Sequence, residues 1–293
     1  MSPQRTPSER ERSERERGAP RAGRSEKRTQ SPPPRPEALP AEVVDSHCHL
    51  DAMGVDVGQS LSDARAVGVT RVVTVGDTLE SSRWCASVAA THPGVVATVA
   101  VHPNEVGGID ESTWDGLAAL AARPEVRAVG ETGLDYYWDR VPAAAQQEAF
   151  RRHIGLAKQA GKALVIHDRD AHADVLRALA EEGAPEHTVF HCFSGDAEMA
   201  RQCVRAGYVL SFAGTVTFKN AASLREAALA VPVDQLLVET DAPFLTPAPY
   251  RGRPNAPYLV PLTVRALASL KSVHIEHLCE HVTRTAQRVF GTW

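Results

Sequence analysis

Two histidines separated by one residue follow an apolar run in the stretch "VVDSHCHLDA" (43–52). They are His47 and His49, with Cys48 between them. Side chains alternate along a strand, so the two imidazoles point one way and the cysteine points the other way. Two imidazoles on one face are natural ligands for a divalent ion. Taken alone, the pair is also compatible with chance or with two hydrogen-bonded histidines.

Four further polar side chains stand where other apolar runs end. Glu131 lies in "AVGETGLD", His167 in "LVIHDRD", His191 in "VFHCFSG" and Asp241 in "LVETDAPF". In a barrel of parallel strands all such ends open onto one face, so these residues and the histidine pair converge there. Six nitrogen and oxygen ligands suit two metal ions about 3.5–4 Å apart, bridged by a carboxylate. Glu131 is the expected bridge because the fourth strand lies opposite the first.

The apolar runs that carry these residues alternate with helix-like segments. Helical spacing is seen before Gly161, a plausible helix stop, and after Asp196, a plausible N-cap. Eight strands with intervening helices in about 250 residues predict a single-domain (β/α)8 TIM-type barrel, of the α/β class. An open doubly wound sheet is the alternative, and no glycine-rich phosphate loop supports it. The expected strands are 43–50, 71–76, 95–103, 126–135, 163–169, 188–194, 208–214 and 236–245.

The first forty residues differ from the rest in composition. They hold ten Lys and Arg, six Glu, eight Pro and no aromatic residue. Such a segment buries too little apolar surface to offset its ordering entropy. We therefore expect a disordered tail over 1–40 and the barrel over 41–293. The barrel region has 22 basic and 30 acidic residues, a net charge of −8, which excludes a broad basic surface for duplex DNA.

Cellular context is predicted from what the sequence does not contain. No apolar run approaches the length of about 18 residues that a membrane span needs, and no secretory signal is visible. The five cysteines have no CxxC spacing, as expected of reduced thiols. We therefore expect a cytoplasmic protein without membrane contact. Nothing in the sequence points to a protein partner.

Several motifs in one order give the sequence a family resemblance. With "DSHCHLD", "GETGLDYY", "FHCFSG" and "ETDAPFLTP", the chain resembles the TatD-like metal-dependent hydrolases, often described as deoxyribonucleases, among the amidohydrolase-type barrels. The resemblance covers 43–290. It implies a hydrolase that cleaves phosphodiester bonds of DNA, expected to be exonucleolytic, with two divalent ions (Mg, Mn or Zn). The family's ligands fall on His47, His49, Glu131, His167, His191 and Asp241.

The sequence departs from the family pattern at two positions. The third-strand motif usually reads His-Pro-His, whereas "VHPNEV" keeps His102 and has Asn104 in the third place. A later motif often continues Asn-Glu-Pro, whereas "RPNAP" has Ala256 in the acidic place. Both positions belong where a phosphate or leaving strand would sit. The departures therefore bear on substrate preference more than on metal binding.

His102, Arg251 and Arg253 are the candidates for binding substrate. His102 ends the third expected strand, and the two arginines follow the eighth. A guanidinium fork matches phosphate oxygens in geometry. Because the barrel region is negative, single-stranded or terminal DNA entering the barrel mouth is the favoured substrate.

Other residues have expected supporting roles. Asp45 is the candidate for orienting a ligand histidine, as outer carboxylates do, or else a strand-end turn residue. Glu239 is expected to act as a structural hydrogen-bonding group. Tyr136, Tyr137 and Phe193 are the aromatic side chains considered for stacking on a base, with packing as the alternative for at least one.

Asp241 and Glu131 are the expected catalytic residues. Asp241, as ligand and base, would take the proton from the attacking water. An amide or ester hydrolase on the same barrel is the rival enzyme. Many such sites use a carboxylated lysine on the fourth strand, where this chain has Glu131, and Lys162 lies at the wrong end of the fifth strand. A metal-binding protein without turnover is the remaining alternative.

Overall fold

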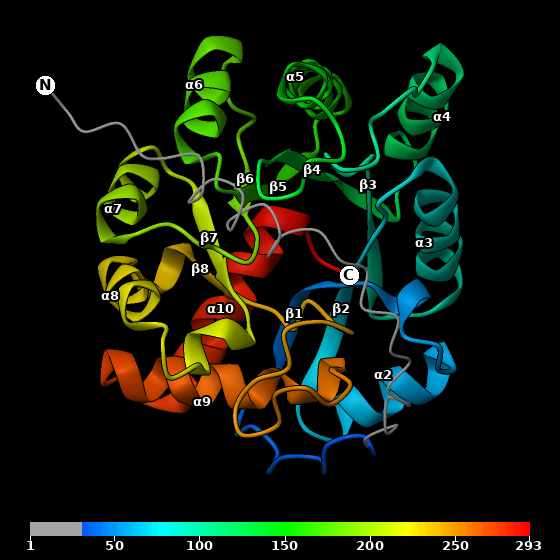
Figure 1. Ribbon diagram of the computed structural model, residues 1–293. Helices are drawn as coiled ribbons and strands as arrows, with labels where there is room; N and C mark the ends of the chain where they lie inside the picture. The colour runs from blue at the N-terminus through cyan, green and yellow to red at the C-terminus, as the bar shows by residue number, and fades with distance from the viewer. Residues whose placement is uncertain (1–30) are drawn as a thin grey trace, which may run out of the picture. The chain divides into compact units, whose positions relative to one another are not determined.

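Eight parallel strands follow one another in chain order around a barrel in the computed structural model, which describes residues 31–293 (Figure 1). Each strand pairs in parallel with the next, and helices surround the ring. The predicted (β/α)8 barrel is confirmed. The strands are β1 (Val43–Cys48), β2 (Val69–Val75), β3 (Val95–Val99), β4 (Val126–Asp135), β5 (Ala163–Arg169), β6 (Thr188–Phe190), β7 (Val209–Phe212) and β8 (Leu236–Val238).

The helices lie between successive strands, except for the last two, which follow β8, and local signals set several of the helix ends. The side chain of Asp196 accepts the backbone N–H of Met199, and Gly161 ends the long helix Ala143–Ala160 in a left-handed conformation, both as predicted. The helices are α2 (Val57–Arg65), α3 (Leu79–Thr91), α4 (Glu111–Ala121), α5 (Ala143–Ala160), α6 (His172–Glu182), α7 (Ala197–Arg205), α8 (Ala222–Ala230), α9 (Val260–Lys271) and α10 (Ile275–Phe290). Short 3₁₀ turns are η1 (Leu50–Ala52), η2 (Gly214–Thr217), η3 (Val233–Gln235) and η4 (Pro257–Leu259).

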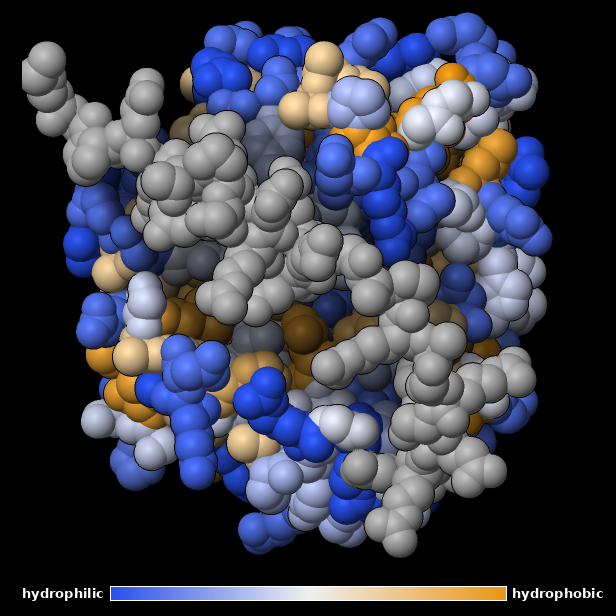
Figure 2. All heavy atoms as spheres, in the orientation of Figure 1, coloured by the Kyte–Doolittle hydropathy of each residue, from blue (hydrophilic) through white to orange (hydrophobic). Residues whose placement is uncertain are grey.

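Two apolar layers stabilise the barrel. The larger lies between the strands and the outer helices, and Cys48 packs there as a buried thiol. The smaller fills the interior of the ring with side chains from all eight strands, and Val289 and Phe290 of α10 belong to it. Figure 1 shows α10 in the middle of the ring, while Figure 2 shows mainly hydrophilic residues around the outer rim of the visible face.

The ring closes where β1 meets the segment after β8. Cys48 and Ala242 form a parallel bridge, and the N–H of His49 donates to the carbonyl of Ala242 at 2.8 Å. The N–H of Asp241 donates to the carbonyl of His47 at 2.9 Å. These backbone bonds bring residues from the two ends of the chain to the same strand-end face.

Residues 32–40 lie against the barrel, which differs from the expectation of a disordered tail up to residue 40. The hydroxyl of Tyr258 donates to the carbonyl of Pro33 at 2.8 Å, and Leu39 is buried. The compact unit begins at Pro32. Composition alone could not predict this packing. Prolines leave the unfolded segment little conformational entropy to lose, so a short segment can bury a few side chains once the barrel surface has formed. The expectation for 1–30 lies outside the described residues.

None of the helices in the described part of the chain combines the length and the apolar character that crossing a membrane requires. The cytoplasmic location stays a prediction.

Candidate metal centre

Glu131 lies between histidines from three other strands or strand ends. Its Oε2 is 2.9 Å from Nε2 of His47 and 2.8 Å from Nε2 of His191. Its Oε1 is 3.8 Å from Nδ1 of His167. The rings of His47 and His191 stack with centroids 3.8 Å apart and planes 9° apart. One buried carboxylate therefore faces ligand atoms on both of its oxygens.

Asp241 forms the second carboxylate of the cluster. Its Oδ1 lies 3.4 Å from Nε2 of His49 and 3.8 Å from Nε2 of His47. Asp241 has a left-handed φ of 55°, which an aspartate tolerates better than most residues, and this turns the chain at the strand end. All six predicted ligands thus meet at one face, and we call this set the candidate metal centre: His47, His49, Glu131, His167, His191 and Asp241.

The donor atoms of this centre are better satisfied by binding a cation than by hydrogen bonds to one another. Among residues 31–293, both ring nitrogens of His47 and Oε2 of Glu131 are buried without a hydrogen-bond partner. Two ligand atoms that share one tetrahedral ion at about 2.0–2.2 Å each lie about 3.3–3.6 Å apart. The donor atoms here are 2.8–3.8 Å apart, which spans that range. Leaving such atoms unpaired in a buried site is costly, and a divalent ion would remove that cost.

The electrostatics keep both carboxylates ionised. Burial would raise the pKa of Glu131, but His191, His102 and His47 hold it well below its usual range. Burial would lower the pKa of His49, but the carboxylates of Asp241, Asp77 and Glu131 outweigh burial and raise it to about 10. The raised pKa values of His49 and His191 favour protonated rings, and binding a cation would displace those protons.

Two glycines on β4 let Glu131 project into the centre. A Cβ on Gly130 would lie 2.6 Å from the Cβ of Val165, and a Cβ on Gly133 would lie 2.1 Å from the carbonyl oxygen of His167. The β4–β5 register also shifts between Val129 and Thr132. Such irregularities re-aim side chains at strand ends. The spacing "GETG" therefore allows close contact with the strand that carries His167.

His102, predicted to bind substrate, faces the carboxylate of Glu131 as a hydrogen-bond donor. The backbone N–H of Asn104 donates to Nδ1 of His102 at 3.1 Å. An accepting Nδ1 has no proton, so the neutral ring carries its proton on Nε2. That Nε2 lies 3.1 Å from Oε1 of Glu131. His102 therefore presents an N–H to the centre, and its contact with substrate stays a prediction.

Asp135 supports His167 from behind. Its Oδ2 lies 3.2 Å from Nε2 of His167 and accepts the side-chain N–H of Asn104 at 2.9 Å. Its Oδ1 accepts the backbone N–H groups of Tyr137 and Trp138. This contact leaves Nδ1 of His167 for the centre, as outer carboxylates do for ligand histidines. Asp135, His167 and His102 also form a group that could hold an ion.

Two further carboxylates contact histidines of the candidate metal centre on the ring nitrogen that faces away from Glu131 and Asp241. Oδ1 of Asp77 is 3.5 Å from Nδ1 of His49. Oε1 of Glu239 is 3.4 Å from Nδ1 of His191 and accepts the backbone N–H of Cys192 at 2.8 Å. The hydrogen-bonding role expected for Glu239 agrees with this geometry. The sequence analysis missed Asp77 and Asp135, although a polar residue at the end of an apolar run was the available signal for both.

Asp45 does not orient a ligand imidazole. Its Oδ1 accepts the backbone N–H of Thr240 at 2.9 Å, and its Oδ2 accepts the Thr240 hydroxyl. Burial raises the pKa of Asp45 to about 8, against the lowering effect of these hydrogen bonds. Asp45 ties β1 to the segment after β8. Sequence could not reveal this partner, which lies 195 positions away.

The predicted phosphate-binding arginines make other contacts. The guanidinium of Arg251 lies 4.0 Å from the ring centroid of Phe218. Nη2 of Arg253 donates to the carbonyl of Pro32, and its guanidinium lies 5.3 Å from the Tyr250 ring. These contacts lie outside the six residues of the candidate metal centre. Phosphate binding by either arginine stays a prediction.

The aromatic candidates differ in exposure. Phe193 is buried, so packing accounts for it. The hydroxyl of Tyr136 donates to Asp174 at 2.8 Å, which fixes that ring. Tyr137 is exposed, as base stacking requires, and Trp138 and Phe244 are exposed aromatics that the sequence analysis did not consider.

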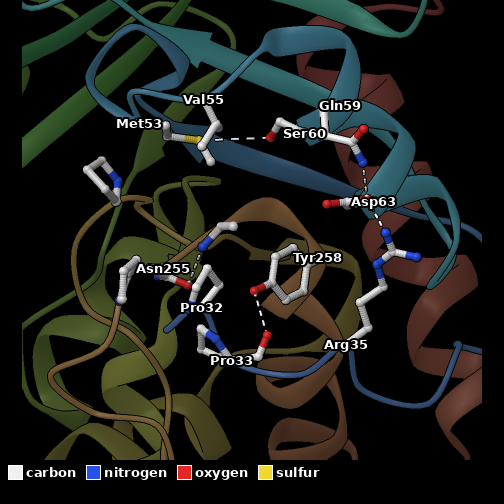
Figure 3. A pocket seen from close by; sticks show the side chains of 13 residues that line it. Pro32, Pro33, Arg35, Met53, Val55, Gln59, Ser60, Asp63, Asn255 and Tyr258 are labelled. Atoms are coloured by element: carbon white, nitrogen blue, oxygen red, sulfur yellow. Dashed lines mark hydrogen bonds and ion pairs between the residues drawn. The ribbon is translucent and has the colours of Figure 1, made fainter. Parts of the chain in front are cut away.

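A mainly apolar pocket of about 280 Å³ lies beside the strand-end segments after β1 and β8 (Figure 3). Met53 and Val55 line it on one side, and Tyr258 lines it on another. The ion pair of Arg35 with Asp63 lies at its edge. One wall thus comes from the segment before β1 that the sequence analysis had assigned to the tail.

Comparison with known proteins identifies the family. The family model described as "TatD related DNase" matches residues 44–291. The chain belongs to the TatD family. This TatD-family chain is 50% identical over 258 residues to an uncharacterized metal-dependent hydrolase TatD of Mycobacterium tuberculosis, covering 85% of this chain and 98% of that protein. It is 40% identical over 254 residues to the uncharacterized metal-dependent hydrolase YcfH of Escherichia coli K12, covering 85% and 95%.

Solved structures agree with this assignment. The TatD homologue YjjV of Escherichia coli K12 superposes with a TM-score of 0.82 at 26% identity, covering 86% of this chain and 98% of that one. A TatD-family hydrolase from Entamoeba histolytica superposes with a TM-score of 0.77 at 19% identity, which bears on the fold alone. The TatD-family chain is therefore a metal-dependent hydrolase on a (β/α)8 barrel.

Proposed function

We propose that this chain hydrolyses phosphodiester bonds of DNA with two divalent ions held at the candidate metal centre. The observation that carries the proposal is the position of Glu131, whose two carboxylate oxygens face different histidines. A carboxylate between two ligand sets is the usual bridge of a two-ion site. His47, His49, His167, His191 and Asp241 would supply the remaining ligands of the two ions.

Bound ions would polarise a phosphoryl oxygen and lower the pKa of a bound water towards about 7. Asp241 is suited to take the proton. Burial would raise its pKa, but His49, His47 and His191 lower it, so the carboxylate is ionised and able to accept. His102 is suited to donate its Nε2–H to an oxygen of the phosphate.

DNA is the proposed substrate because the family is described as related to a DNase and the centre matches phosphodiester chemistry. Single-stranded or terminal DNA fits better than duplex. The region after residue 40 has a net charge of −8, and a negative surface cannot clamp two phosphate backbones. Digestion from an end is proposed on the same ground.

A substrate panel with metal-replete protein tests the proposal. The panel contains end-labelled single-stranded DNA, the matching duplex, RNA, a generic phosphodiester and acyl esters and amides, each with Mg²⁺, Mn²⁺ or Zn²⁺. We expect single-stranded DNA to be cut fastest and a chelator to abolish cleavage. Hydrolysis of the esters or amides without cleavage of any phosphodiester would overturn the substrate assignment. If no substrate in the panel were hydrolysed, the protein would be a metal-binding protein without catalysis.

A further inference from the structure

Large aromatic side chains are exposed at only two places in residues 31–293. Tyr137 is 55% exposed and Trp138 is 45% exposed, and both follow β4. Phe244 is 55% exposed and follows β8. Exposing such rings to water is unfavourable, and aromatic rings that remain exposed commonly mark binding surfaces.

The two places lie on opposite sides of the candidate metal centre. In a ring of eight strands in chain order, β4 and β8 stand half a turn apart. Both aromatic sites follow strand ends, so they lie on the face where the centre opens. The centre therefore lies between Phe244 on one side and Tyr137 with Trp138 on the other.

Each aromatic site is tied to the centre by direct contacts. The N–H groups of Tyr137 and Trp138 donate to Asp135 at 3.0 and 3.2 Å, and Asp135 contacts His167. On the other side, the Phe244 ring lies edge-on to the His49 ring with centroids 6.0 Å apart. The backbone that carries Tyr137 and Trp138 and the ring of Phe244 are thus held next to the candidate metal centre.

Arginines accompany the aromatic pair. The guanidinium of Arg169 lies 3.9 Å from the ring centroid of Tyr137, and that of Arg140 lies 5.3 Å from the Trp138 ring. The Tyr137 and Trp138 rings meet at 90° with centroids 5.0 Å apart. Aromatic faces beside cations are the composition of surfaces that stack unpaired bases and hold the phosphate backbone.

We propose that Phe244 and the Tyr137–Trp138 pair each stack one unpaired base, one on either side of the phosphodiester bond that is cleaved. The inference rests on the proposed function and names how that substrate is held. Duplex DNA cannot be held in this way, because its bases are already stacked and paired. The two stacking sites therefore add to the preference for single strands that the net charge already favours.

Affinity measurements test the stacking sites apart from catalysis. Trp138→Ala and Phe244→Ala are compared with Leu229→Ala, an apolar side chain that is 53% exposed on α8, a helix of the outer ring. All three are placed in an Asp241→Asn background, and binding of a labelled single-stranded oligonucleotide is followed by anisotropy. We expect the aromatic variants to bind about 5- to 150-fold more weakly and the leucine variant to be unchanged. Equal affinity of all three would overturn the proposal.

Oligonucleotides with one abasic residue identify the partner of each ring. An abasic residue on one side of the cleaved bond should weaken binding about 5- to 150-fold when the matching ring is present. It should have no further effect in the variant that lacks that ring. Equal losses in variant and parent would mean that the ring does not contact that base, and the stacking inference would fall. Failure of the proposed function looks different: the parent protein with native Asp241 would then cut no phosphodiester at all.

Discussion

Asn104 donates its side-chain N–H to Oδ2 of Asp135 at 2.9 Å, and the same oxygen lies 3.2 Å from Nε2 of His167. The backbone N–H of Asn104 also donates to His102. Asn104, which departs from the family pattern, therefore holds the side chains of Asp135 and His102 in place beside the candidate metal centre. At this position an amide can donate to a carboxylate while adding no charge.

Asn104→Ala is expected to weaken metal binding. Without the amide, Asp135 loses one of its donors and holds His167 less firmly, and outer-shell changes of this kind typically cost about 10–100-fold in metal affinity. A competition titration against a chromophoric chelator measures the affinity. Asn220→Ala, an exposed asparagine outside the candidate metal centre, is the control. Unchanged affinity in the Asn104 variant would remove it from the support of His167.

Glu131→Gln should leave the fold intact and lower metal content below two ions per chain. An amide oxygen is a much poorer ligand for two cations than a carboxylate. Elemental analysis of the purified protein gives the metal content, and circular dichroism reports on the fold. Glu125→Gln, just before the other end of β4, is the matched control. Full occupancy in the Glu131 variant would mean that this side chain is not a ligand.

Asp241→Asn separates chemistry from binding. The amide keeps the volume and one oxygen, but it cannot take a proton near neutral pH. Five of the six ligands remain, so at least one ion should stay bound, and a short single strand should still bind. Loss of a general base costs about 10²–10⁴-fold, so single-turnover cleavage of an end-labelled oligonucleotide should fall at least about 10²-fold. Cleavage near the parent rate would show that another group is the base.

His153 is expected to make stability fall in acid. Its ring is fully buried and accepts the backbone N–H of Val101, and burial lowers its pKa to about 3 from the ordinary 6.5. Below about pH 6.5 the unfolded chain takes up a proton that the folded chain refuses until about pH 3. The contribution of His153 to the free energy of unfolding should therefore be constant above pH 6.5 and fall by about 1.4 kcal/mol per pH unit below it.

His153→Gln isolates this contribution, because glutamine does not titrate. Urea unfolding at pH 7, 6, 5 and 4 gives the difference in unfolding free energy between parent and variant. The difference should shrink by about 1.4 kcal/mol per unit between pH 6 and pH 4. A difference independent of pH would mean that His153 titrates normally in the folded protein.

The segment before β1 is expected to stabilise the barrel without serving the metals. A chain beginning at Ala41 should fold and bind metal, but its free energy of unfolding should be lower by about 2 kcal/mol, because the site of Leu39 is then uncovered. A chain beginning at Pro32 should retain the stability of the full chain. Urea unfolding of both chains decides this, and equal stability would contradict the packing of Leu39.

Most of the site residues that the sequence could predict lie at strand ends. Continuous apolar runs followed by His167 or Glu131 are visible in the sequence, and one barrel face collects them whatever the details of packing. Strand lengths were predicted less well. The expected strands 188–194 and 236–245 shorten to β6 and β8, because the chain turns at Cys192 and Asp241, both with positive φ.

Contacts between distant segments could not be predicted. The pairing of Asp45 with Thr240 depends on ring closure, and the exposure of Trp138 depends on how its loop leaves β4. Neither follows from local pattern, because residue type sets what a side chain can bond to, not which distant group will be near it. The packing of residues 32–40 was missed for the same reason.

The junction between β1 and the segment after β8, called the seam here, determines when during synthesis the candidate metal centre can form. His47 and His49 emerge early in synthesis and Asp241 emerges late, yet backbone bonds at the seam join them. A chain that ends before residue 241 has an open sheet and an incomplete ligand set. Contacts between such distant segments form late, after most of the loop-closure entropy has been lost. Nascent and truncated chains therefore lack the complete centre, and hydrolytic activity should appear only once the ring has closed.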